Sequence, residues 1–295
     1  MGLVNYLKYG EWNITKANKY MKDNLRKILK EGVNDFGGNV RPRYESDGEP
    51  AHTLYTTFVY EEYDLSKGEF PISDLRPVAL KMAIGEILAF YQDQTNNIAL
   101  MKEKYNLHWW DLWDIGDGSI GIRYGETVRK YNLVNKLLNQ FENDMFSRRK
   151  MMNLIQEQDI IDDPKGLISC FFLTNWEVRK IGEDIYLDCN LTSRSSDYSV
   201  AGTINRLQYL ALQMAFANQF GFKLGKFNVF TSNQHIYDRH LYQAKELLKR
   251  KGSGKQPKLK LNVPVGTNFY DIKVSDFELV DFKCDYPQLK FELGV

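Results

Sequence analysis

The chain has 295 residues, 43% of them hydrophobic and 26% charged, with a formal net charge of +1 at pH 7. No apolar run approaches the roughly 18 residues of a membrane span, and a net charge near zero gives no long-range field for duplex nucleic acid. These values are typical of an ordinary globular protein that needs neither a membrane nor a nucleic acid, and the length permits a large buried core.

The cysteine content and the first residues of the chain indicate which cellular compartment to expect. Cys170, Cys189 and Cys284 are too few and too scattered for a disulfide framework or a four-ligand zinc site, so we expect no metal. The segment after Met1 lacks a basic start followed by an apolar stretch, so we expect no secretory signal. We therefore expect a cytoplasmic protein with free thiols.

The first elements are a helix and a strand. Apolar residues at helical spacing predict a helix over 19–30, ended by Gly32. A loop rich in Gly, Asn, Asp and Pro follows over 33–50, and the aromatic and Thr content of 53–63 then predicts a strand.

Two helices are predicted next. Pro77, at the favoured first position, begins a long helix over 77–105, and Glu86 lies within its apolar stripe. A Trp- and Gly-rich loop over 108–125, too long for a simple connector, separates it from a second helix over 131–145.

The second half of the chain alternates strands and helices. Strands are predicted over 166–178, 185–192 and 227–231, and helices over 204–220, the most apolar of the chain, and 235–250. Two late strands are predicted over 259–263 and 277–282. Because no internal repeat or domain linker is visible, we expect residues 1–295 to form a single α+β domain with strands packed on helices.

The chemistry of a cysteine depends on its surroundings. Cys189 alternates with polar residues on an apolar strand face, which is typical of a small buried hydrophobe. Cys170 follows the turn-forming residues 163–166, and a thiol with a pKa of ~8.5 needs a nearby cation to become a nucleophile.

Arginines are the candidates for this cation. Arg194, beside three serines, suits an anion such as phosphate, whereas Arg148 and Arg149 suit either that anion or a solvated helix cap.

Other side chains suggest a binding site for a polar, flat molecule. Glu86 in an apolar stripe costs several kcal/mol unless it is paired or functional, and a raised pKa would make it a proton relay. His235 and Tyr237, two residues apart, project together from a strand or turn and suit a sugar hydroxyl, although each also suits a core. The Trp-rich loop suits stacking on a heterocycle or a structural cluster.

Taken in order over about 32–295, these segments resemble the thymidylate synthase family. The matching segments are 46–53 (SDGEPAHT), 83–88 (AIGEIL), 110–113 (WDLW), 123–125 (RYG), 147–149 (SRR), Cys170, 194–197 (RSSD), Asn205, 235–237 (HIY) and 291–295 (FELGV). The resemblance implies an α+β fold in which a large bent mixed sheet packs on helices and meets its copy sheet to sheet in a homodimer.

The resemblance also implies a substrate, a cosubstrate and residue roles. The reaction is the reductive methylation of dUMP to dTMP with 5,10-methylenetetrahydrofolate, which leaves as dihydrofolate. The catalytic residues implied are Cys170, which adds to uracil C6, Glu86, which relays protons, and Tyr124, which orders water. The residues implied for the 5′-phosphate are Arg148 and Arg149 from the partner chain, and Arg194, Ser195 and Arg41 from within the chain. Those implied for the deoxyribose hydroxyl are His235 and Tyr237, and those for the folate are Trp110, Trp113, Asp197 and Val295.

Asn205 is implied to read the base edge, because a carboxamide offers a donor and an acceptor to uracil, whereas cytosine-using relatives carry an acid there. Several residues depart from the family pattern near the expected site: Ser169, Phe171, Ser193, residues 152–155 and the ending Gly294 and Val295. These departures leave open a nucleotide 5-hydroxymethylase of the same family, acting on dUMP or dCMP. A second alternative, from another class, is a nucleotide-binding regulator without catalysis.

Overall fold

A six-stranded sheet organises the computed structural model, which describes residues 14–295. The residues after Met1, on which the expectation of no secretory signal rests, lie outside the described part. The strand order is β1-β2-β6-β5-β4-β3, and only β5 and β6 pair in parallel, so the sheet is mixed as predicted. The strands are β1 Val33–Asn34, β2 Thr53–Asp64, β3 Met151–Asn153, β4 Phe171–Ile181, β5 Asp184–Asp197 and β6 Lys223–Tyr237.

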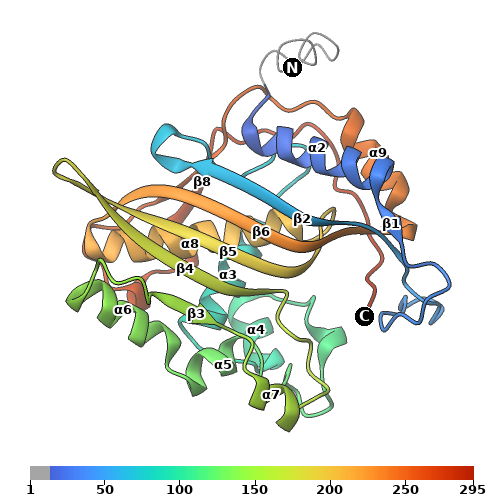
Figure 1. Ribbon diagram of the computed structural model, residues 1–295, viewed down its shortest axis with the longest axis horizontal. Helices are drawn as coiled ribbons and strands as arrows, with labels where there is room; N and C mark the ends of the chain where they lie inside the picture. The colour runs from blue at the N-terminus through green and yellow to red at the C-terminus, as the bar shows by residue number, and fades with distance from the viewer. Residues whose placement is uncertain (1–13) are drawn as a thin grey trace.

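Helix α8 packs on one face of this sheet, against β5 and β6, and α3 packs on α8 (Figure 1). Helix α8, Gly202–Phe220, is buried on almost every side, which agrees with its predicted place in the core. Helix α2 packs on β2, and α9 packs on α2 and β6. The helices besides α8 are α2 Lys16–Glu31, α3 Leu80–Tyr91, α4 Ile98–Tyr105, α5 Gly125–Lys130, α6 Leu133–Asn143, α7 Glu157–Asp162 and α9 Leu241–Lys249. A second sheet pairs β7 Lys258–Leu261 with β8 Phe277–Val280, close to the two predicted late strands.

The register of the long strands brings distant segments together. Asp197 at the end of β5 pairs with His235 near the end of β6, and His235 in turn pairs with Tyr55 of β2. Because β4 and β5 are antiparallel, the start of β4 lies beside the end of β5, where Phe171 pairs with Ser193. The residues flanking these strand ends therefore meet at one edge of the sheet.

The long helix predicted over 77–105 is wrong, because the chain forms two helices, α3 and α4, instead. Gln94 has a positive φ of 53°, and Asn97 caps α4 by accepting a hydrogen bond from the Leu100 amide at 2.9 Å. A Cβ on Gly125 would lie 2.2 Å from the Thr95 carbonyl oxygen, so the break is held by a tertiary contact. Neither this contact nor the cap forms part of the apolar periodicity.

The helix predicted over 235–250 is wrong at its start. Strand β6 continues through Tyr237, which pairs with Thr53, and a 3₁₀ turn over Asp238–His240 precedes α9. The ladder with β2 supplies backbone partners that a helix would have to replace. The strand predicted over 166–178 begins only at Phe171, and the helix predicted over 131–145 begins at Leu133. Four short elements were not predicted: β1, β3, α5 and α7.

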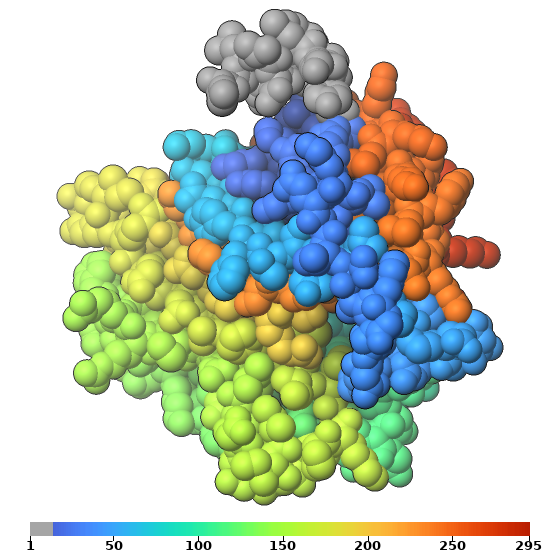
Figure 2. All heavy atoms as spheres, turned by 45° about the vertical axis from the view of Figure 1, so that its right-hand side comes forward, coloured from blue at the N-terminus to red at the C-terminus, as the bar shows by residue number. Residues whose placement is uncertain are grey.

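The opposite face of the sheet exposes aromatic side chains. Tyr60 of β2 and Phe230 of β6 pair directly and lie with their ring centroids 5.0 Å apart, and both are about half exposed. Phe58 is 80% exposed beside them. In Figure 2 the light-blue atoms of β2 reach the surface with orange atoms of β6 beside them. Among residues 14–295, no helix is long and apolar enough to cross a membrane.

Candidate active site

Cys170 lies immediately before β4 and is held against the end of β5. Its carbonyl accepts a hydrogen bond from the Arg194 amide at 2.9 Å, and Arg194 Nη2 lies 3.7 Å from its sulfur. The thiol is therefore in contact with a cation, as its proposed chemistry requires. Cys189 is fully buried in the core, as predicted for a small hydrophobe, and Cys284 forms its only hydrogen bond in the described chain to the Tyr286 carbonyl.

The Arg194 guanidinium is fixed by backbone carbonyls. Nε donates to Ser169 O at 3.1 Å and Nη2 donates to Ile168 O at 2.5 Å, while Nη1 makes no hydrogen bond to any described residue. This arrangement positions one charge beside the nucleophile and leaves one nitrogen for an anion.

Burial and charge act in opposite directions on Cys170. Burial raises the pKa of the thiol, and the positive charges of Arg194 and Arg41 together with the Tyr124 hydroxyl lower it without cancelling the rise. The thiol form is therefore favoured at neutral pH. Proximity to Arg194 still stabilises the thiolate when a base removes the proton.

Tyr124 contacts the nucleophile through the backbone. Its hydroxyl oxygen accepts a hydrogen bond from the Cys170 amide at 3.2 Å, and its ring stacks on Phe90 at 4.7 Å. It has a φ of 46°, which costs a non-glycine residue about 1–3 kcal/mol. Burial raises the pKa of Tyr124 well above its ordinary value, so the phenol stays neutral and keeps a proton to donate.

Glu86 is the buried carboxylate that the apolar stripe predicted. It is 8% exposed, and it accepts hydrogen bonds from Trp109 Nε1, from Trp110 Nε1 at 3.1 Å and from Gln208 Nε2 at 2.9 Å. Burial raises its pKa to about 7, although the three hydrogen bonds favour the ionised form. A carboxyl group with this pKa gives and takes protons at neutral pH.

Asn205 reaches Glu86 through Gln208, a residue that was not predicted. The two amides lie three residues apart on α8, on one side of the helix. Asn205 Nδ2 donates to Gln208 Oε1 at 2.9 Å. The available signal was a glutamine three residues from Asn205 in a helix predicted to lie in the core, where a buried polar group requires a partner.

His235 and Tyr237 stand at the end of β6, and their rings lie 5.2 Å apart. His235 Nδ1 is 2.9 Å from Asn233 Oδ1, and burial lowers the pKa of His235, so the ring is neutral. Burial also raises the pKa of Tyr237. Both side chains therefore act as neutral hydrogen-bonding groups, and the Tyr237 hydroxyl makes no hydrogen bond to any described residue.

Asp197 and Arg41 lie at the same edge of the sheet. Asp197 Oδ1 accepts hydrogen bonds from Ser199 Oγ at 3.2 Å and from the Val200 amide at 3.3 Å. The Arg41 guanidinium lies 5.7 Å from the centre of the Trp113 ring, a cation–π contact that holds this indole beside the site.

The chain ending packs against the sugar-binding candidates. Val295 and Arg43 exchange two backbone hydrogen bonds of 2.8 and 2.9 Å. A Cβ on Gly294 would lie 2.9 Å from Ala51 Cβ and 3.0 Å from the Tyr237 ring. The small residue at 294, a departure from the family pattern, is thus explained by close packing.

The structure does not bring every candidate together. Arg148 and Arg149 are exposed between α6 and β3, and their guanidinium groups make no hydrogen bond or ion pair within residues 14–295. The Ser195 hydroxyl likewise has no partner there. Two departures from the family pattern, Ser169 and Phe171, are buried on either side of Cys170.

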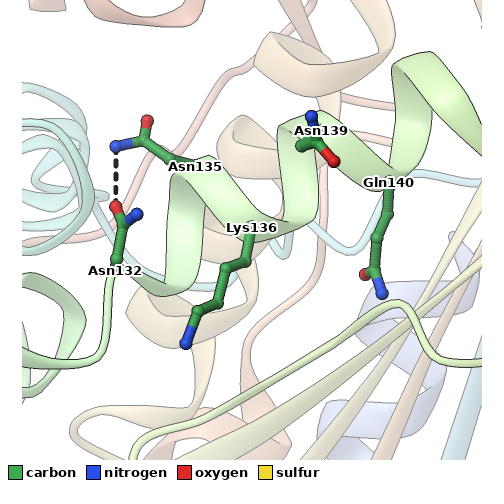
Figure 3. A pocket seen from close by; sticks show the side chains of 5 residues that line it. All are labelled: Asn132, Asn135, Lys136, Asn139 and Gln140. Carbon is green, nitrogen blue, oxygen red and sulfur yellow. Dashed lines mark hydrogen bonds between the residues drawn. The ribbon is translucent and has the colours of Figure 1, made fainter.

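A separate surface hollow of about 530 Å³ lies over α6 (Figure 3). It is lined by Asn132, Asn135, Lys136, Asn139 and Gln140. Four of these side chains are neutral amides, and none is a nucleophile or a carboxylate. It contains none of the predicted site residues, so we assign no chemistry to it.

Comparisons with known proteins identify the family of the chain. The family model for thymidylate synthase matches residues 18–295. The thymidylate synthase of Streptococcus gordonii is 51% identical over 283 residues, which cover 96% of this chain and 100% of that protein. The enzyme of Streptococcus sanguinis is 50% identical with the same coverage.

Solved structures point to the same family. The thermostable thymidylate synthase A from Bacillus subtilis superposes with a TM-score of 0.84 at 31% identity, covering 94% of this chain and 99% of that one. Together with the family model and the relatives at half identity, this likeness shows that the chain belongs to the thymidylate synthase family.

Proposed function

We propose that this chain carries out the methylation of dUMP to dTMP, the reaction of its family, at the cluster that contains Cys170, Glu86 and Asn205. The single observation that carries this assignment is the continuous set of hydrogen bonds from Asn205 through Gln208 to Glu86. It connects an amide that suits a base edge to a carboxyl group that titrates near neutral pH.

The nucleophilic step belongs to Cys170. The thiol loses its proton, the sulfur bonds to C6 of the uracil, and the electron pair of the C5–C6 double bond moves toward C5 and O4. Arg194, 3.7 Å from the sulfur, stabilises the thiolate before the bond forms. C5 then bonds to the one-carbon unit. When C5 loses its proton, the bond between that carbon and the folate nitrogen breaks. After a hydride has reached that carbon, the sulfur leaves C6 and the C5–C6 double bond is restored.

Proton transfer belongs to Glu86 and Tyr124. The protonated carboxyl group donates through water toward O4 as negative charge develops there, and the carboxylate accepts the proton back. The neutral phenol of Tyr124 orders the water that takes the C5 proton. Because the Tyr124 oxygen accepts from the Cys170 amide, its position is tied to that of the nucleophile.

The nucleotide is held at three points. The free Nη1 of Arg194, the Ser195 hydroxyl and the exposed Arg41 bind the 5′-phosphate from within the chain. His235 and Tyr237 hydrogen-bond the deoxyribose hydroxyl. Asn205 reads N3 and O4 of the base.

The folate site lies beside these residues. The ring of Trp113 is partly exposed, so a stacking surface is available. Asp197 Oδ2 lies 3.8 Å from His240 Nδ1 and makes no hydrogen bond to a described residue, so it can still accept one from the folate. When bound, 5,10-methylenetetrahydrofolate supplies the one-carbon unit and the hydride. Trp110 is buried with its N–H on Glu86, so we assign it the positioning of Glu86 along with an edge contact to the folate. Val295, paired with Arg43, covers the folate and excludes water.

The second copy of the chain completes the phosphate site. The exposed aromatic face formed by Phe58, Tyr60 and Phe230 supports sheet-to-sheet pairing, because burying it removes apolar surface from water. Arg148 and Arg149, which lack partners within the described chain, bind the phosphate in the other protomer. We further propose that the chain is a single domain that acts in the cytoplasm.

One incubation tests this function against its alternatives. The protein is mixed with dUMP and 5,10-methylenetetrahydrofolate, dihydrofolate is followed by absorbance, and the nucleotide is weighed by mass spectrometry. We expect dTMP and dihydrofolate in equal amounts. Hydroxymethyl-dUMP without dihydrofolate would identify a hydroxymethylase, and nucleotide binding without turnover would identify a regulator.

A further inference from the structure

We propose that Gln208 determines the preference for uracil over cytosine, because it fixes which way the Asn205 amide faces. The inference rests on the proposed role of Asn205 in reading the base. It concerns a positioning residue that need not touch the substrate.

Glu86 sets the direction of the hydrogen bonds that join it to Gln208 and join Gln208 to Asn205. Both indole nitrogens, of Trp109 and Trp110, donate to Glu86 Oε2, and an indole N–H can only donate. The other oxygen, Oε1, accepts from Gln208 Nε2 at 2.9 Å. The Gln208 amide therefore turns its nitrogen toward Glu86 and its oxygen away.

The same polarity continues to Asn205. Gln208 Oε1 accepts from Asn205 Nδ2 at 2.9 Å, so the Asn205 nitrogen faces Gln208 and its oxygen faces the other way. One hydrogen of Nδ2 and the whole of Oδ1 remain for a ligand. When Glu86 is ionised, a flipped Gln208 would place two donors against each other at Asn205 and two acceptors against each other at Glu86.

Amide orientation distinguishes the two bases. Uracil presents a donor at N3 and an acceptor at position 4, whereas cytosine presents an acceptor at N3 and a donor at position 4. A base whose C6 is held at Cys170 and whose phosphate is held by arginines has one orientation. One of the two orientations of the Asn205 amide then matches the donor and acceptor of uracil, and the flipped orientation matches those of cytosine. By preventing the Asn205 amide from flipping, Gln208 therefore favours uracil over cytosine.

The surroundings make the orientation rigid. Gln208 is 2% exposed, so water cannot readily replace either hydrogen bond. Arg206, which follows Asn205 on α8, forms two 2.7 Å hydrogen bonds to Glu61 of β2 through Nε and Nη2. This turn of the helix is anchored to the sheet, so Asn205 cannot adjust by moving the backbone.

The test compares substrate preference in Gln208→Leu and wild-type protein at pH 8, where Glu86 is mainly ionised. The measurements are kcat/KM for dUMP, the inhibition constant of dCMP, and any 5-methyl-dCMP by mass spectrometry. Leucine fills the space and removes the polarity, so we expect the preference for dUMP over dCMP to fall about ten- to hundredfold, the size of one lost directional contact. An unchanged preference overturns the inference.

Two further variants separate polarity from packing. Gln213→Leu removes the other fully buried glutamine of α8, which donates to Leu187 O and Lys226 O, and it should lower stability without changing base preference. Gln208→Glu keeps an acceptor facing Asn205, so it should lose activity but retain most of the preference for dUMP. A loss of preference in Gln213→Leu, or an equal loss in Gln208→Leu and Gln208→Glu, would count against Gln208 polarity. If Gln208→Leu does not fold, Gln208→Met is measured in the same way.

Different results would contradict the proposed function and the inference about Gln208. Wild-type protein that makes no dTMP from dUMP contradicts the proposed function, whatever the variants do. Active wild-type protein with the same base preference in Gln208→Leu contradicts only the inference about Gln208.

Discussion

Arg206 and Glu61 form a bidentate ion pair inside the protein, with side chains 4% and 1% exposed. Tyr63, Tyr198 and Asn24 also donate hydrogen bonds to the Glu61 carboxylate. The pair joins α8 to β2 one residue beyond Asn205, so it links the stability of the core to the position of the residue proposed to read the base.

Removing one member of this pair should strongly destabilise the protein. Glu61→Leu leaves the Arg206 charge buried without its partner, which costs about 3–5 kcal/mol in the free energy of unfolding. Urea denaturation measures the change. The double variant Glu61→Leu with Arg206→Met should recover much of the loss, and a double variant as unstable as the sum of both single variants would contradict this account.

Cys170→Ser should abolish turnover and preserve nucleotide binding. An oxygen nucleophile at this position lacks the acidity of a thiol, and loss of a nucleophile reduces kcat on the order of 10⁴-fold or more. Stopped-flow kinetics and calorimetric titration with dUMP measure the two effects. Cys284→Ser is the matched control, because that thiol hydrogen-bonds the Tyr286 carbonyl and no other residue of the described chain, and its loss should leave kcat unchanged.

Glu86 should produce an activity profile that changes near neutral pH. With its pKa raised to about 7 by burial, both protonation states are populated there, and the pH dependence of kcat should show an apparent pKa near this value. Glu86→Gln, which cannot transfer a proton, should lower kcat about 10²- to 10⁴-fold and remove this inflection. A profile that keeps the inflection in Glu86→Gln would assign it to another group.

The same pKa shift should make unfolding depend on pH. The folded state holds the proton up to a pH of about 7, whereas the unfolded chain releases it near the ordinary value of 4.5. The stabilisation by this group is therefore complete below pH 4.5 and is lost as pH rises toward 7, by on the order of 3 kcal/mol. Relative to wild type, Glu86→Gln should be more stable at pH 8 than at pH 4.5 when both are unfolded in urea. A constant difference between the two proteins would show that Glu86 is not the group responsible.

Subunit mixing tests the shared phosphate site. Arg149→Ala and Cys170→Ala proteins should each be inactive, because each protomer needs its own cysteine and the partner's arginine. After exchange at equal concentrations, half of the dimers are mixed and each has one intact site, so about a quarter of wild-type activity should return. Exchange is verified by native mass spectrometry of differently labelled chains, and verified exchange without recovery would locate Arg149 outside the shared site.

Sequence patterns predicted the parts of the structure that depend on local periodicity. The apolar stripe placed Glu86 in the core, because burial of one helical face produces apolar residues at helical spacing. The apolar run over 204–220 correctly predicted α8, which is buried on almost every side. The break between α3 and α4 could not be predicted in this way, since it depends on a contact between Gly125 and Thr95. The extension of β6 through Tyr237 likewise depends on its pairing with β2.

The candidate site likewise contains residues that could be predicted from the sequence and residues that could not. Resemblance to the family identified Cys170 and Arg194, which the structure brings into contact. Gln208 was missed because its importance comes from two hydrogen-bond partners, Asn205 and Glu86, of which only the first is close in sequence. The binding partner of Arg148 and Arg149 is still a prediction, because residues 14–295 of one chain contain no partner for their guanidinium groups.

The two indoles on Glu86 also give the protein an optical signal of its own. Of its five tryptophans, Trp109 and Trp110 donate to one carboxylate oxygen, and Trp113 lies beside Arg41. Trp176 is buried elsewhere, hydrogen-bonded to Thr174. Indole emission is sensitive to nearby charge, so ionisation of Glu86 and arrival of a ligand both change the fluorescence without any attached label. Rapid mixing followed by this emission would time the steps of the reaction in unmodified protein.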